Sequence, residues 1–144
     1  MSRQDLMDER GSSTLELAIM APVIIALLLM LIAFGRTATA TSHVDGAAFA
    51  TARAASIERS SAAADTAASA TARDYLDQRG LTCDPQVVDV DTTGFARAVG
   101  ERAEVAVTIS CTVPMREVTG VLPFGTRTFT ATAVSPIDSY RGAP

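Results

Sequence analysis

The sequence predicts an α+β protein: a long N-terminal helix with a membrane-spanning first half, followed by a small, mostly antiparallel three-stranded sheet. The first observation is that the 19 positions from Leu17 to Gly35 contain no charged residue. A helix of about 20 apolar residues crosses a hydrocarbon core of about 30 Å. The second observation is that apolar residues recur at helical spacing up to Gly80 and then alternate as in strands.

Length and composition limit the kind of protein this can be. The chain has 144 residues, which leaves room for one small domain beside the membrane segment. Its net charge is −4, all 12 basic residues are Arg, and Trp is absent. Nucleic-acid surfaces need clustered positive charge or aromatic stacking platforms, so we expect no nucleic-acid partner.

The first 11 residues are predicted to be a leader peptide. Met1 to Arg10 is polar and carries acids as well as Arg3 and Arg10. An ordinary secretory signal has a shorter apolar core, and its small-residue cleavage site follows that core. Here the small residues Gly11 and Ser12 precede the apolar run. Cleavage between them would keep the transmembrane helix, residues 12–36, on the mature chain.

The orientation of this helix follows from the charges on its two sides. The two cysteines after it indicate the same orientation, because a disulfide between them would need an oxidising compartment. Arg3 and Arg10 lie on the N-terminal side and only Arg36 on the other, a bias toward a cytoplasmic N-terminus. We therefore expect a single-pass protein of the cytoplasmic membrane with an extracytoplasmic C-terminal domain. Pro22 lies inside the run, where membrane helices tolerate proline with a local kink.

Residues 37–80 are rich in Ala, Ser and Thr and are predicted to form a helix or, alternatively, a flexible stalk. Ala has the highest helix propensity, and it recurs here at spacings of three and four. Gly80 after Arg79 is a typical helix C-terminus. Propensity is poor at residues 37–42 and at Gly46, so continuity with the membrane helix stays open. A face of small residues suits close packing against other helices.

Residues 81–135 are predicted to form the β domain, and residues 136–144 a tail. Alternating apolar residues predict strands at 86–91, 104–113 and 126–134, joined by connections at 92–100 and 116–125. Packing the long helix on this sheet would give the domain one core.

Cys83 and Cys111 are the two cysteines, and both follow the membrane segment. An oxidising compartment would let them pair, and Cys111 shares the apolar face of its strand. The alternative is two buried free thiols. Two cysteines 28 residues apart with one histidine do not supply the ligands of a zinc site, so we expect no metal.

Glu16 is the candidate functional residue with the strongest signal. A carboxylate at the edge of a membrane helix is costly and usually has a partner. One interpretation is a capping box, in which Ser13 caps the helix and Glu16 reaches back to the Ser13 amide. The other is that Glu16 pairs with a positive group, such as the new Ser12 amine, in the same or a neighbouring subunit.

Other polar groups predict no active site, so we expect no catalysis, no cofactor and no small-molecule substrate. His43 stands near Ser42 and Asp45, but neighbours in sequence point in different directions on a helix, and a catalytic triad is defined by geometry. Two acidic pairs, Asp89 with Asp91 and Glu101 with Glu104, suit solvated edges and lack calcium-loop spacing.

The N-terminal motif resembles that of the TadE family, the minor pseudopilins of tight-adherence (Flp-type) pilus systems. The resemblance rests on Gly11, on Glu16 five residues later, on Pro22, and on Phe34-Gly35-Arg36 after the aliphatic run. It covers about 26 residues. Leu17 replaces the aromatic residue usual after the glutamate, and Ala33 replaces an acid often found before Phe-Gly-Arg.

The resemblance implies a pilin-like protein whose leader is cut by a prepilin peptidase after Gly11. It further implies that Glu16 aligns the subunit with other pilins and pseudopilins, and that the product takes part in assembling a pilus or secretion machine. The alternative is an uncleaved, membrane-anchored extracytoplasmic binding or sensor module.

Overall fold

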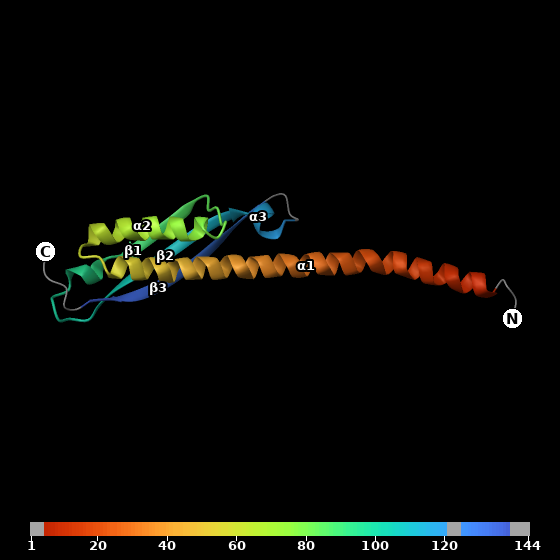
Figure 1. The fold of residues 1–144 in the computed structure, drawn as a ribbon, viewed down its shortest axis with the longest axis horizontal. Helices are drawn as coiled ribbons and strands as arrows, with labels where there is room; N and C mark the ends of the chain where they lie inside the picture. Colours follow the sequence, from red (N-terminus) through yellow and green to blue (C-terminus); the bar gives the residue numbers. More distant parts are fainter. Residues whose placement is uncertain (1–4, 121–124, 139–144) are drawn as a thin grey trace.

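The computed structural model describes the backbone of residues 5–120 and 125–138, and the side chains within these ranges from Glu16 onward. Its elements follow the chain as α1 (Asp5–Ser56), α2 (Ser61–Asp77), β1 (Gln86–Asp91), η1 (Thr93–Ala96), β2 (Ala103–Pro114), α3 (Met115–Thr119) and β3 (Thr126–Ile137). The predicted fold class is confirmed: a long apolar N-terminal helix precedes a small antiparallel sheet. The N-terminal half of α1 projects far beyond the sheet (Figure 1).

α1 is one continuous helix of 52 residues, so the membrane segment and the first part of the Ala-rich region are joined. The helix passes through Pro22 and through the stretch of poor propensity at 37–42. In that stretch the hydroxyls of Thr37, Thr39, Thr41 and Ser42 donate to the backbone carbonyls four residues earlier, at 2.9–3.1 Å. Ser and Thr hydroxyls can disfavour a helix by bonding to the backbone in other conformations. Here they bond to carbonyls of the same helix, so the helix continues through this stretch.

Most of residues 37–80 are helical, but they form parts of two helices rather than one, because the chain breaks between Ser56 and Ser61. Ser60 has an extended backbone (φ −140°, ψ 155°), and its hydroxyl accepts a hydrogen bond from the Ala63 amide at 3.3 Å. This is an N-cap, which satisfies one of the free amides at the start of α2. The chain thus reverses direction and α2 packs back along α1 (Figure 1).

The predicted stop at Gly80 is confirmed as a turn with left-handed backbone at that glycine (φ +68°). The Leu81 amide donates to the Leu76 carbonyl at 3.1 Å, and the Gly80 amide donates to the Asp77 carbonyl at 3.0 Å. This pair of bonds is a Schellman motif, in which glycine takes the left-handed position without strain.

The sheet is an antiparallel meander with strand order β1-β2-β3. β1 has the predicted bounds, and β2 extends the predicted strand by one residue at each end. β3 runs to Ile137, so both its predicted end at Val134 and the predicted tail from Pro136 need correction. β3 is an edge strand, where a proline lacking an N–H is tolerated, and Ser135 and Ile137 continue its buried face.

The core lies between one face of this sheet and the two helices. The helices meet through small side chains at helical spacing, which lets their axes approach closely. The sheet contributes alternate residues of β2 and β3. The buried members include Ala48, Ala52 and Ala55 of α1, Ala64, Ala68 and Ala72 of α2, Val105, Val107, Ile109 and Cys111 of β2, and Phe129, Ala131 and Ala133 of β3.

The outer face of the sheet is polar. Three cross-strand pairs of hydroxyls, Thr108 with Thr132, Ser110 with Thr130, and Thr112 with Thr128, form hydrogen bonds of 2.8–3.1 Å between β2 and β3. The alternation predicted from sequence is therefore confirmed: one face of the sheet is buried and the other faces solvent.

Candidate assembly and processing site

The N-terminal half of α1 is an exposed apolar surface. Its large apolar side chains from Leu17 to Phe34 are 42–71% exposed, and they surround the helix rather than forming one stripe. Within the described residues, α1 is the one helix long and apolar enough to cross a membrane, and its most apolar window is not buried at all. A single such helix near an N-terminus suits a membrane-anchored component.

The processing residues predicted from sequence, Gly11 and Ser12, lie within α1. The structure gives their backbone as helical, and their side chains lie outside the described part. Glu16 is exposed and stands directly before the apolar run. In an α-helix, residues four apart share a face and lie about 6 Å apart along the axis. Ser12 and Glu16 have this spacing. If the chain were cleaved after Gly11, the new N-terminal amine at Ser12 would therefore lie one helical turn from Glu16.

The full-length chain does not use the capping box predicted for Ser13 and Glu16, but the structure does not test that interpretation for a chain cleaved after Gly11. Its premise is that the helix begins at Ser13, but α1 is already helical from Asp5. An amide inside a helix has an intrahelical carbonyl partner, so the Ser13 amide needs no cap. Cleavage after Gly11 would place Ser13 among the first, unpaired amides of the helix, so capping and pairing with an amine both stay open for Glu16 in the mature chain.

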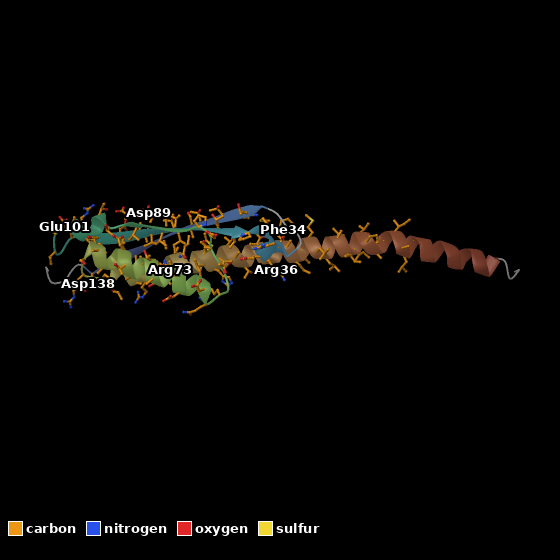
Figure 2. All side chains as sticks on the ribbon, turned by 90° about the horizontal axis from the view of Figure 1, so that it is seen from above. Phe34, Arg36, Arg73, Asp89, Glu101 and Asp138 are labelled. Carbon is orange, nitrogen blue, oxygen red and sulfur yellow. A yellow bond between two sulfur atoms is a disulfide. The ribbon has the colours of Figure 1, made fainter. Side chains whose placement is uncertain are left out.

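The apolar run ends where the outer domain begins. Figure 2 places Phe34 and Arg36 at the point where α1 leaves the body of the domain. There the short helix α3, in the connection between β2 and β3, packs on α1 and buries Val118 and Thr119. α3 ends at Thr119, and Gly120 follows it with a left-handed backbone (φ +69°) and lies against the Arg36 guanidinium. The predictions did not include α3, a five-residue helix inside an expected connection.

Cys83 and Cys111 form the predicted disulfide, with their Cα atoms 5.0 Å apart. Cys111 is fully buried on the inner face of β2, and Cys83 lies in the segment between α2 and β1. The bond therefore fastens the end of the helical hairpin to the central strand.

The remaining polar candidates are spread over the surface. The Ser42 hydroxyl donates to the Ala38 carbonyl, whereas His43 lines a groove with Arg36 and Arg79, so the Ser42, His43 and Asp45 group forms no relay. Asp89, Glu101 and Glu104 are exposed. No cluster of three or more potential metal ligands occurs among the described residues.

Asp91 is the one carboxylate whose pKa moves clearly among those described. Its Oδ1 accepts a hydrogen bond from the Thr93 amide at 3.0 Å. Hydrogen bonding by Thr93 favours the charged form and lowers the pKa of Asp91 below its ordinary value of 3.8. This group closes the turn into η1. It also lines a shallow cleft of about 620 Å³, together with Arg97, Arg102 and Glu104.

The structure also reveals a basic residue that the sequence predictions missed. Arg127 is the second residue of β3 and lines an apolar groove beside the exposed half of α1, together with Met30 and Phe34. The signal was present in the strand alternation, since Arg127 precedes the buried Phe129 by two residues and so shares its face.

Comparison with known protein families identifies residues 11–53 as a match to the family described as TadE-like protein. The match begins at Gly11 and ends within α1, and it confirms the resemblance predicted from the N-terminal motif. It indicates a role related to Tad pili, with partners from that system and a membrane helix. Comparisons with curated proteins and with solved structures find no match.

Proposed function

We propose that this chain is a TadE-like minor pseudopilin that takes part in assembling a Tad pilus or a related secretion machine. A prepilin peptidase cuts after Gly11, and the mature protein begins at Ser12. The observation that carries the proposal is the family match, which starts at Gly11 and covers the exposed apolar helix. The role is one of assembly rather than catalysis.

In this proposal the apolar half of α1 lies in two environments in turn, first the membrane and then the assembled pilus. Before assembly it spans the cytoplasmic membrane once, with the C-terminal domain on the extracytoplasmic side. During assembly it packs against the corresponding helices of other pilins and pseudopilins. Exposed apolar side chains on every face suit both lipid and a helical bundle. Because α1 continues to Ser56 in the core, any shift of the membrane segment moves the outer domain with it.

Glu16 aligns the helix during assembly by pairing with an N-terminal amine. A carboxylate beside a lipid-exposed segment is costly unless it has a partner. Cleavage creates such a partner at Ser12, one helical turn away, and the same group on a neighbouring subunit offers an equivalent partner. Capping of its own helix by Ser13 and Glu16 is the alternative in the mature chain, and variants of Glu16 in the assembly experiment below separate the two roles only if cleavage and folding stay normal.

The Cys83–Cys111 disulfide supports an extracytoplasmic location for the outer domain. Disulfides persist in oxidising compartments and are rare in the cytosol.

The experiment that tests the assembly role replaces Glu16 in cells that carry the Tad pilus system. We expect Glu16→Ala to be cleaved normally but to be depleted from sheared pili or from the assembly complex. Glu16→Gln should behave similarly, because an amide cannot form the ion pair. Glu101→Ala, at the far end of the domain (Figure 2), is the matched control and should assemble as the wild type does. Normal piliation by both Glu16 variants would refute the role.

A further inference from the structure

An apolar groove of about 450 Å³ runs along α1 where the helix emerges from the outer domain. Met30, Phe34, Ala38 and Thr41 of α1 form one wall, at helical spacing. Thr119 of α3 and Arg127 of β3 form the other. The groove thus joins the exposed apolar surface to the folded domain.

Arg127 faces this groove from the inner side of the sheet. It pairs in register with the buried Val113, and Phe129, Ala131 and Ala133 continue its face into the core. Its guanidinium carbon lies 5.5 Å from the centroid of the Phe129 ring. No carboxylate is among the described residues that line the groove. A permanent cation therefore stands beside an apolar groove whose described lining holds no counter-charge.

When α1 spans a bilayer, the groove lies at the depth where the hydrocarbon core meets the headgroups. The uncharged run ends at Gly35, so Met30 and Phe34 lie at hydrocarbon depth when α1 spans a bilayer. Thr41 lies six residues beyond Gly35, about 9 Å farther along the axis. The headgroup layer on each side of a bilayer is about 5–8 Å thick. The groove therefore crosses this boundary, and Arg127 lies on its opposite wall.

We propose that this groove binds an anionic phospholipid from the leaflet on the side of the outer domain. An acyl chain lies along Met30 and Phe34, and the phosphate accepts hydrogen bonds from the Arg127 guanidinium. Guanidinium groups bind phosphate oxygens in a bidentate geometry. The lack of a carboxylate in the groove leaves a net positive site, which favours a lipid of net negative charge over a zwitterionic one.

A phospholipid fits the groove better than the apolar helix of a second copy does. That helix would cover Arg127 with hydrocarbon and offer no counter-charge, which is costly within a membrane. Arg36 and Arg116 add positive charge at the same end of the domain, and Glu117 of α3 offsets one of these charges. The net charge around the groove stays positive, which anionic headgroups would neutralise.

The test uses the full-length protein in phosphatidylcholine vesicles containing a small amount of photoactivatable phosphatidylglycerol. We expect labelling on peptides that contain the groove residues of α1. Arg127→Gln should reduce this labelling about fivefold, the effect of one Arg near an anionic surface. Arg127→Lys should keep much of it. Arg73→Gln, which removes an exposed arginine of α2 (Figure 2), is the matched control and should label as the wild type does.

Three results would overturn the proposal. The first is equal labelling of the groove by a photoactivatable phosphatidylcholine. The second is equal labelling of the Arg127→Gln and Arg73→Gln proteins, both with an intact disulfide. The third is an unlabelled groove in a protein whose Ala38→Cys variant forms a disulfide-linked dimer, which would assign the groove to a second copy.

Discussion

The hydroxyl of Ser135 in β3 donates to the hydroxyl of Ser56, the last residue of α1, at 3.0 Å in the buried core. The Ser56 hydroxyl in turn donates to the Arg53 carbonyl at 2.9 Å. This chain of hydrogen bonds fastens the end of α1 to the edge strand of the sheet. It adds a polar contact to the packing of the C-terminal half of α1 on α2 and the sheet.

Removing one member of this pair is expected to destabilise the outer domain. Ser56→Ala leaves the buried Ser135 hydroxyl without its acceptor, a loss of about 1–3 kcal/mol in the free energy of unfolding. Ser56→Ala with Ser135→Ala removes both polar groups, so it should cost less than the sum of the single changes. Denaturant unfolding of the full-length protein in detergent measures all three. Additive losses would show that the two hydroxyls do not interact.

Gly46 is predicted to be required for the packing of α1 against α2. A Cβ at this position would meet the hydroxyl of Tyr75, whose ring lies under the Arg79 guanidinium at 3.5 Å. Ala normally stabilises a helix by about 1 kcal/mol relative to Gly. We expect Gly46→Ala to lose that gain and to destabilise the domain. Tyr75→Leu in the same chain should restore part of the loss.

Gly35→Ala is the matched control for Gly46, because nothing lies within 4 Å of a Cβ added there. It should leave the unfolding of the outer domain unchanged. Equal effects of Gly35→Ala and Gly46→Ala would mean that Tyr75 does not restrict position 46.

The disulfide is predicted to supply a large share of the stability of this small domain. Its cysteines are 28 residues apart, and closing such a loop stabilises a fold by about 3–4 kcal/mol in the loop-entropy account. Cys83→Ala with Cys111→Ala should lower the denaturation midpoint accordingly. Thiol labelling of protein isolated from the cell envelope checks the bond itself, and reactive thiols before reduction would contradict it.

The sequence was sufficient for the class of the fold because its signals are local. The alternation in β2, the apolar run and the Gly80 turn each depend on neighbouring residues, and each appears in the structure as predicted. The disulfide was also predictable, since Cys111 shares the buried face of its strand.

Most of the features that were missed depend on tertiary context. The break after Ser56 falls at Ile57-Glu58-Arg59, where no Gly or Pro marks a helix end. The Ser60 cap is a local signal that the prediction did not use, whereas the contact of Ser56 with Ser135 is tertiary. Pro136 could be placed in a strand only once β3 was known to be an edge. The groove beside Arg127 could not be predicted, because its other wall is formed by α1, some ninety residues earlier in the sequence.

The most direct test of a processed assembly helix is the intact mass of the protein extracted from membranes of cells with an active prepilin peptidase. The account predicts a mature chain that begins at Ser12, and a full-length chain when the peptidase is absent. A chain that still begins at Met1 or Ser2 in the presence of the active peptidase would contradict it and favour an uncleaved membrane-anchored module.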